Sequence, residues 1–467
     1  MKNDKIEKKL KSISKYITYS EDKELNKKYS SDWRGRFTKI SLGVIFPKTT
    51  KEVSKIVKLA KTYNIKLIPQ GGNTGLVGGT APSKNRNQII LNLEKMNQIL
   101  EIDEQNLSVE LEAGVILQHA ISKLEDKDYT FPLNMSSIGS AQVGGAISTN
   151  AGGMNVIKYG SIRENILALE VVLSNGDILT LGSNLIKDNT GYNLKDIFCG
   201  SEGTLGIITK ARIKIFPKPV NESTCFISIA NFENVINIFK YVRKNFGDKI
   251  ERIEFISDLS FELCLKHNLL NKRFFKKKTN YYLLIKFIYF DRSEKYMENL
   301  EQFFIDQEKN CVEFLLGQNE KENIDFWKFR ESLTEAQKIE GKLLGFDISV
   351  PINYMDIFLK KSKEQINKLL PGIKFHIFGH LGDSNIHFNL IEPENLQKDF
   401  YKFEKKIKKI INNLIIEFKG SVSAEHGIGI LKKDDFKKTK SVKEIEIMKK
   451  IKKLLDPQNI LNKDKIF

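Results

Sequence analysis

The chain has 467 residues, of which 41% are hydrophobic and 28% are charged, and its net charge is +17. This composition is ordinary for a globular protein and excludes collagen-like structure, wholesale disorder and a small disulfide-stapled scaffold. Only ten of the 75 positively charged residues are arginines. Proteins that read nucleic acids rely on arginine for bidentate contacts, so we expect no nucleic-acid partner.

No stretch of the sequence is typical of a signal peptide or of a membrane-spanning helix. The first twenty residues are charged and lack a continuous apolar core. The most apolar stretch, residues 281–290, is too short to span a bilayer and contains Lys286. We therefore expect a cytoplasmic protein, with at most peripheral contact between its positive surface and a membrane.

The first predicted element is a charged helical arm over residues 1–39. A short strand at residues 44–46, a helix and a second strand at residues 65–68 then form a β-α-β unit that ends in a glycine-rich loop. Strand-like runs and turn-forming residues continue as far as residues 216–219, where the sequence FPKP interrupts the pattern. Two prolines so close together indicate a domain boundary.

The composition changes at about residue 221, where glycine becomes rarer and lysine and aromatic residues increase. Strands such as residues 281–290 alternate with amphipathic helices near residues 232–245 and 293–306. This alternation is typical of an antiparallel α+β domain. Residues 434–467 are mostly helical, with a break at Asp456-Pro457.

Three glycine-rich clusters occur within about 140 residues, at positions 69–79, 144–160 and 199–208. Glycines let backbone N–H groups approach an anionic or flat ligand closely, although each cluster alone could also be a tight turn. No G-x-G-x-x-G or Walker A pattern is present, so a nicotinamide-binding Rossmann domain is not indicated. Three clusters together favour a shared ligand site over packing alone.

The second chemical signal is a group of histidines beside a carboxylate. Four of the six histidines lie within 51 residues of one another: His376, His380, His387 and His426. A hairpin at residues 382–384 would bring His380 and His387 together, and Glu425 would add an oxygen ligand. Two imidazoles and one carboxylate suit a catalytic metal such as zinc, manganese or iron. The alternative is a set of buried histidines whose hydrogen bonds are satisfied near a turn.

Five motifs, in the same order, resemble the FAD-linked 2-hydroxyacid dehydrogenases of the vanillyl-alcohol oxidase type. They are PQGGNTGLVGG, GGAISTNAGGMNVIKYG, DNTGYNLKDIFCGSEGTLGIIT, GHLGDSNIHFN and SAEHGIG. This group includes dehydrogenases of D-2-hydroxyglutarate and D-lactate and the catalytic subunit of glycolate oxidase. The resemblance implies an α+β fold with a two-part FAD-binding domain at residues 40–220 and an antiparallel-sheet cap domain at residues 221–420. Residues 421–467 would return to the FAD-binding domain.

The resemblance also implies which residues bind the cofactors. Those for FAD are Gln70, Gly71, Gly72, Asn73, Thr74, Gly75, Ser140, Gly144, Gly145, Asn150, Gly153, Tyr159, Gly160, Glu202, Gly203, Ile207, Ile208 and Asn462. Residues 69–82 contain no histidine or cysteine that could tether a flavin, so we expect non-covalent FAD. The implied ligands of a divalent metal, with zinc as the first choice, are His380, His387 and Glu425.

For the substrate, the resemblance implies that Arg330 and Thr334 bind its carboxylate, that Asn389 contacts it and that His426 takes its hydroxyl proton. On a helix, Arg330 and Thr334 would share one face at i, i+4 spacing. Relatives of the 2-hydroxyglutarate type carry a lysine where this chain has Gly345. A missing cation at that position weakens the case for a dicarboxylate substrate.

We therefore expect an FAD-dependent and metal-dependent dehydrogenase that oxidises a D-2-hydroxy acid, such as D-lactate, D-2-hydroxyglutarate or a glycolate-like acid, to the 2-oxo acid. The reduced flavin needs an external acceptor, for which electron-transfer flavoprotein, a quinone, a cytochrome and an iron–sulfur partner all remain open. A homodimer is compatible with the sequence. Two alternatives are a metal-dependent hydrolase built on the His/Glu cluster, which predicts a colourless protein, and an FAD oxidase of another alcohol.

Overall fold

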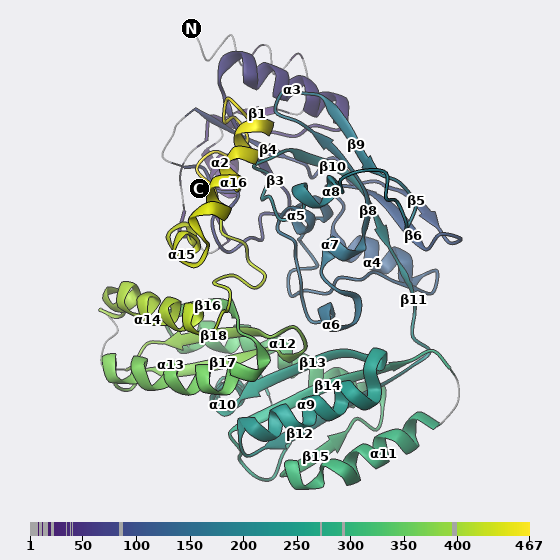
Figure 1. Cartoon of the computed structure of the whole chain (residues 1–467), viewed down its shortest axis with the longest axis vertical. Helices are drawn as coiled ribbons and strands as arrows, with labels where there is room; N and C mark the ends of the chain where they lie inside the picture. Colours follow the sequence, from purple (N-terminus) through teal and green to yellow (C-terminus); the bar gives the residue numbers. More distant parts are fainter. Residues whose placement is uncertain are drawn as a thin grey trace. The chain divides into compact units, whose positions relative to one another are not determined.

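The computed structural model describes residues 8, 12, 17–19, 23–33, 35–37, 39, 41–83, 87–270, 273–291, 295–394 and 399–467. The chain divides into two compact units (Figure 1). Unit 1 comprises Met1–Gly152, Tyr159–Pro217 and Glu425–Phe467, and unit 2 comprises Gly153–Lys158 and Lys218–Ala424. The sequence predicts boundaries at residues 220 and 420; unit 2 begins and ends within a few residues of them and also takes in the short segment 153–158.

Unit 1 begins with a sheet in the strand order β1-β2-β4-β3. Its strands are β1 (Ile17–Tyr19), β2 (Gly43–Ile45), β3 (Lys66–Gln70) and β4 (Gln88–Asn92). β2 and β3 both pair in parallel with β4, and helix α3 (Thr50–Tyr63) connects them. The side chain of Thr49 accepts a hydrogen bond from the N–H of Glu52 and so caps the start of α3. The β-α-β unit predicted from the sequence is present.

The N-terminal arm differs from the helix that the sequence predicts over residues 1–39. Helix α2 (Lys23–Ser30) is present, but Ile17–Tyr19 form strand β1, antiparallel to β2. β-Branched and aromatic residues favour extended backbone, and β1 pairs an edge of β2 that would otherwise be open. Residues 1–7, 9–11, 13–16, 20–22, 34 and 38 of the predicted arm lie outside the described residues.

The second sheet of unit 1 is antiparallel, in the order β5-β6-β10-β8-β9. Its strands are β5 (Ile99–Asp103), β6 (Ser108–Glu112), β8 (Ile166–Val172), β9 (Ile178–Gly182) and β10 (Ile207–Lys214), and a separate two-stranded pair joins β7 (Tyr129–Thr130) to β11 (Phe216–Pro217). The other helices of unit 1 are α4 (Leu117–Glu125), α5 (Val143–Ser148), α7 (Ile162–Asn165), α8 (Lys195–Phe198), α15 (Lys433–Thr439) and α16 (Val442–Leu455), whereas most of α6 (Val156–Tyr159) lies in the segment 153–158 of unit 2. Ile460 and Leu461 pack in the core around α3, so the C-terminal segment belongs to unit 1 by its packing.

Unit 2 is built on a seven-stranded antiparallel sheet in the order β15-β12-β14-β13-β17-β18-β16. The strands are β12 (Asn221–Ile229), β13 (Ile250–Ser257), β14 (Tyr281–Tyr289), β15 (Glu313–Leu316), β16 (Leu343–Ser349), β17 (Lys374–His380) and β18 (Asn385–Ile391). The apolar stretch near residues 281–290 is therefore a central strand. The antiparallel sheet expected for the second domain is confirmed.

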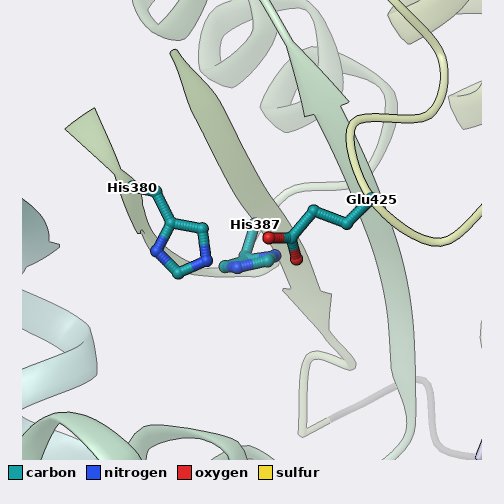
Figure 2. Close-up of side chains that lie close together, drawn as sticks. All are labelled: His380, His387 and Glu425. Atoms are coloured by element: carbon teal, nitrogen blue, oxygen red, sulfur yellow. The ribbon is translucent and has the colours of Figure 1, made fainter. Parts of the chain in front are cut away.

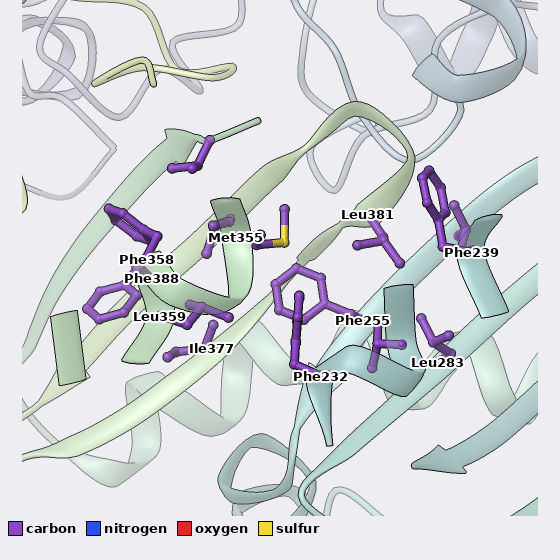
Figure 3. Close-up of a cluster of buried hydrophobic side chains, with 14 of the residues drawn as sticks. Phe232, Phe239, Phe255, Leu283, Met355, Phe358, Leu359, Ile377, Leu381 and Phe388 are labelled. Atoms are coloured by element: carbon purple, nitrogen blue, oxygen red, sulfur yellow. The ribbon is translucent and has the colours of Figure 1, made fainter. Parts of the chain in front are cut away.

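Different helices pack on the two faces of this sheet. One face packs against α9 (Phe232–Phe246), α11 (Lys295–Gln307), α13 (Met355–Leu369) and α14 (Glu404–Glu417), and the other against α10 (Asp258–Lys266) and α12 (Glu320–Glu340). Figure 3 shows part of the first core, in which Phe232 packs against Phe255 and Phe358 packs against Phe388. The face under α12 carries buried charged and histidine side chains, among them Glu254, Arg330 and His380. Within the described part of the chain, no helix has the length and hydropathy needed to cross a membrane.

Candidate active site

The register of the unit 2 sheet places a set of polar residues on the face under α12. Glu254 lies opposite His380, and His387 lies between Phe378 on one neighbouring strand and Asp347 on the other. Because side chains alternate between the faces of a strand, residues in directly opposite positions share a face. Asn389, two residues after His387, lies on the same face.

A tight hairpin brings His380 and His387 together. Strand β17 ends at His380, the turn Leu381–Asp383 follows, and Ser384 has a left-handed φ of 65° before β18 begins. The ring centroids of the two histidines are 5.1 Å apart. The hairpin thus overcomes the odd sequence spacing, which would place the two side chains on opposite faces of a straight strand.

His380, His387 and Glu425 each offer one ligand atom, and these atoms all lie within 4.8 Å of one another (Figure 2). Glu425 directly follows Ala424, the last residue of unit 2. In Figure 2 one ring nitrogen of His380 is directed toward His387, and the Glu425 carboxylate lies close to the His387 ring. Two imidazoles and a carboxylate are a donor set that fits zinc, manganese or iron.

A second group with the same spacing comprises Asp347, Glu425 and His426. His426 therefore lies next to the first group, where the sequence predicts the base. The other two histidines of unit 2 have structural partners. His376 is fully buried with its Nε2 3.1 Å from the carbonyl oxygen of Leu333, and burial lowers its pKa to about 3.

Arg330 projects from α12 into this face and is held by two contacts. Its Nε donates to Glu254 at 2.7 Å, and its guanidinium carbon lies 4.6 Å from the centre of the Phe378 ring. Neither contact uses the two terminal amino groups of Arg330, which can therefore donate hydrogen bonds to an anion. Thr334 lies one turn further along α12 and is half-buried.

Glu254 was missed by the sequence analysis and is the central carboxylate of this face. It is fully buried, with one oxygen bonded to Arg330 Nε and the other 2.5 Å from His380 Nδ1. Burial by itself raises the pKa of Glu254, but the charges and hydrogen bonds of Arg330 and His380 outweigh it and lower that pKa to about 2. Glu254 is therefore ionised at neutral pH.

Gly345, where the resemblance implies a lysine in relatives of the 2-hydroxyglutarate type, lies on β16 opposite Asn389. Lys342, three residues earlier, contacts Glu392. Its N–H donates to Glu392, and its ammonium nitrogen lies 3.9 Å from the same carboxylate.

The three glycine clusters come together in unit 1, apart from residues 153–158 of the second cluster, which belong to unit 2. A Cβ on Gly71 would lie 3.6 Å from the backbone nitrogen of Gly145, so the first two clusters lie against each other. The N–H of Glu202, in the third cluster, donates to the carbonyl oxygen of Ser148 at 2.7 Å. By contrast, a Cβ on Gly75 or Gly145 would meet nothing within 4 Å. These glycine-lined loops border open space and so fit a cofactor that needs close backbone approach.

All but one of the predicted FAD-binding residues lie in unit 1: Gln70, Gly71, Gly72, Asn73, Thr74, Gly75, Ser140, Gly144, Gly145, Asn150, Tyr159, Gly160, Glu202, Gly203, Ile207, Ile208 and Asn462. Gly153 belongs to unit 2. The side chain of Gln70 donates to the carbonyl oxygen of Tyr29 at 2.8 Å. The side chains of Ile207 and Ile208 are buried in two cores of unit 1, so any contact of these two residues with a cofactor would come from their backbone.

Glu202 ties the third glycine cluster to the C-terminal segment. Its carboxylate accepts hydrogen bonds from the N–H groups of Ile428 (2.7 Å) and Gly429 (2.8 Å). Asn462 donates from its side chain to the carbonyl oxygens of Glu202 (2.7 Å) and Gly79 (3.0 Å). Burial raises the pKa of Glu202. These bonds position the loop that begins with Glu425 and His426.

Comparisons with known proteins match two families in succession along the chain. Residues 41–182 match the FAD binding domain family, and residues 218–466 match the C-terminal domain of FAD linked oxidases. The mitochondrial D-2-hydroxyglutarate dehydrogenase of Arabidopsis thaliana is 34% identical over 96% of this chain and 78% of its own length. The D-2-hydroxyglutarate dehydrogenase of Stutzerimonas stutzeri is 32% identical over 94% of both chains. The solved structure of p-cresol methylhydroxylase superposes with a TM-score of 0.78 at 15% identity, over all of this chain and 96% of that one.

One expectation from the sequence is contradicted. Relatives from Arabidopsis thaliana, Danio rerio and Schizosaccharomyces pombe are named as mitochondrial proteins. Their names point to a mitochondrial location rather than the cytoplasmic one expected from the lack of a signal peptide. Composition and hydropathy alone did not carry this information.

Two other expectations are confirmed. The α+β fold of the vanillyl-alcohol oxidase type agrees with the solved neighbour, and the resemblance to FAD-linked dehydrogenases agrees with the matched families and relatives. The metal-dependent hydrolase alternative, in which the glycine clusters have only structural roles, is excluded by the FAD-binding family match. The chain belongs to the FAD-linked oxidase family, and it is an FAD-dependent oxidoreductase.

Proposed function

We propose that this protein oxidises a D-2-hydroxy acid to the 2-oxo acid, with non-covalent FAD and a divalent metal as cofactors. The observation that carries the proposal is the grouping of His380, His387 and Glu425, linked through Glu254 to the cationic side chain of Arg330. A metal site beside an arginine suits a substrate that has a hydroxyl and a carboxylate on neighbouring carbons. The relatives named for D-2-hydroxyglutarate and for D-lactate support the same class.

Each side chain has a role that follows from its chemistry. When bound, the metal would polarise the substrate hydroxyl and FAD would accept the hydride from the carbon that bears it. Arg330 would bind the substrate carboxylate through its terminal amino groups, with Thr334 and Asn389 as hydrogen-bonding neighbours. A ring nitrogen of His426 would take the hydroxyl proton.

The acceptor of the electrons is an external partner in this proposal. The candidates are electron-transfer flavoprotein, a quinone, a cytochrome or an iron–sulfur protein. A net charge of +17 favours an acidic protein partner. A homodimer remains compatible with the proposal.

The first test is the visible spectrum of the purified protein under anaerobic conditions, before and after each acid of a panel is added. The panel holds D- and L-lactate, D- and L-2-hydroxyglutarate and glycolate. We expect a flavin spectrum that a D-acid bleaches, and denaturation should release the flavin because we propose that it is not covalently attached. Treatment with a chelator should slow the bleaching, and zinc should restore it.

Two outcomes would contradict the proposal. If the flavin is present but no 2-hydroxy acid reduces it, the substrate class is wrong and another alcohol takes its place. If chelation leaves the bleaching rate unchanged while the protein contains no metal, the role of His380, His387 and Glu425 as ligands is wrong.

A further inference from the structure

Glu254 is a buried carboxylate that contacts both Arg330 and His380. It is the only acidic residue among the described side chains that forms an ion pair with Arg330. Its other oxygen faces His380, one of the proposed metal ligands. Phe226, Ile256 and Phe378 belong to the apolar core on the same face. One buried carboxylate therefore bridges a substrate residue and a metal ligand.

The contact with His380 determines which ring nitrogen can bind a metal. Arg330 pairs with one oxygen of Glu254, and a carboxylate in an ion pair with a guanidinium only accepts hydrogen bonds, so Nδ1 of His380 is the donor to the other oxygen. The neutral ring then has its lone pair on Nε2, the nitrogen left for the group that includes His387 and Glu425. A carboxylate behind a metal-binding histidine fixes its tautomer and orientation and raises its basicity.

The contact with Arg330 adds a second effect. A guanidinium and a divalent cation in one buried face would repel each other strongly, because the interior screens charge poorly. The negative charge of Glu254 lies between Arg330 and His380 and offsets that repulsion. At the same time, its bond to Nε orients the guanidinium so that both terminal amino groups remain available for a carboxylate.

We propose that Glu254 is a positioning residue that couples metal binding at His380 to substrate binding at Arg330. The inference rests on the proposed function and goes beyond it by making the two binding events depend on one buried charge. Removing that charge, with the side-chain shape kept, should weaken both events together. A carboxylate that only stabilised the fold would affect neither event in a protein that remains folded.

The test compares Glu254→Gln with Glu251→Gln. Glu251 is a matched control because it lies on the same strand, is also buried and pairs with Arg252 and Lys286, but has no contact with His380 or Arg330. Metal-free protein is titrated with zinc against a chromophoric chelator, which gives the zinc dissociation constant without turnover. KM and kcat are then measured with the best acid of the panel, and circular dichroism checks the fold.

We expect Glu254→Gln to weaken zinc binding about 10- to 100-fold, the range known for partners of metal-binding histidines. KM for the acid should rise in the same variant, and Glu251→Gln should leave both constants near those of the wild type. Combining Glu254→Gln with Arg330→Met removes both charges and should recover part of the zinc affinity. If Glu254→Gln does not fold, Glu254→Asp, compared with Glu251→Asp, gives the same comparison with the charge displaced.

Equal zinc affinity in folded Glu254→Gln and Glu251→Gln would overturn the inference and leave the proposed function intact. Loss of zinc affinity with an unchanged KM would overturn the coupling. A wild-type protein that takes up no zinc would overturn the metal role itself, and the inference with it.

Discussion

Arg330 illustrates how a single residue can be prepared for an anion before the anion arrives. Its Nε is bonded to Glu254, and its planar group stacks on Phe378, so little side-chain freedom remains to be lost when a substrate binds. Lysine could not reproduce this arrangement, because it has neither a planar group nor a fixed fork of donors. The role proposed for Arg330 thus depends on its shape as much as on its charge.

Arg330→Lys should therefore lower kcat/KM for the acid by about 10- to 100-fold, since hydrogen bonds to charged groups contribute about 1.5–3 kcal/mol. Most of the change should appear in KM. The control is Arg243→Lys, an exposed arginine on α9 that stacks on Phe239, which should behave as the wild type. Steady-state kinetics of the two variants test this prediction. Equal kcat/KM values for Arg330→Lys and Arg243→Lys would mean that Arg330 does not bind the substrate.

Glu254 and Glu202 show why part of the site could not be predicted from the sequence. The sequence motifs located the histidines, Glu425 and the glycine loops, because those residue types are unusual at such spacing. Glu254 lies in an ordinary strand, IERIEFIS, where nothing local distinguishes it from the exposed glutamates of a lysine-rich chain. Glu202 is inside a motif, but the bonds of its carboxylate to Ile428 and Gly429 join segments more than 220 residues apart in the sequence.

At the scale of elements, one carboxylate joins three parts of unit 2. Glu340, the last residue of α12, accepts hydrogen bonds from Lys266 at the end of α10 and from Lys374 at the start of β17. It also lies 2.7 Å from Nε2 of His267. Burial raises the pKa of Glu340, but these three partners outweigh it and lower that pKa to about 2. The helix that carries Arg330 is thereby anchored to the strand that carries His380.

A pH dependence follows from this lowered pKa. The folded protein binds the proton of Glu340 less readily than the unfolded chain, whose glutamate has a pKa of about 4.5. The stabilisation is therefore complete above pH 4.5 and is lost as the pH falls toward 2. Glu340→Gln should have a lower melting temperature than the wild type at pH 6, and the difference should shrink as the pH falls from 5 to 3.

The control for this prediction is Glu364→Gln on α13, whose exposed carboxylate pairs only with Lys368 among the described residues. Its melting temperature should follow that of the wild type at every pH. A difference between Glu340→Gln and the wild type that stays constant with pH would mean that the carboxylate charge is not what joins these elements.

The sequence predicts an element correctly when residues within that segment determine its structure. It fails when the structure depends on pairing with a distant strand. The β-α-β unit at residues 44–68 and the hairpin between His380 and His387 follow from turn residues and periodicity within one segment. Strand β1, in an arm expected to be helical, depends on its pairing with β2. The charged residues around it dominate the pattern, whereas the partner strand is more than 20 residues away.

At the scale of the whole molecule, the excess of lysine is the property that no single site explains. The charge of +17 comes from 75 basic and 58 acidic residues, and many of the lysines form exposed pairs that contribute little to stability. Such a surface attracts acidic partners from a distance and speeds their association. An electron acceptor is the partner that the chemistry of a reduced flavin requires.

Electron transfer from this protein to an acidic acceptor protein should therefore slow as salt is added, because the Debye length shrinks to about 10 Å at 0.1 M. We expect the second-order rate constant for reoxidation of the reduced flavin to fall several-fold between low salt and about 0.2 M. An uncharged quinone provides the control, since its rate should not depend on ionic strength. Stopped-flow measurement of flavin reoxidation distinguishes the two cases. If the acidic protein and the quinone respond alike, the positive charge has no part in choosing the acceptor, and the lysines are a general property of the surface.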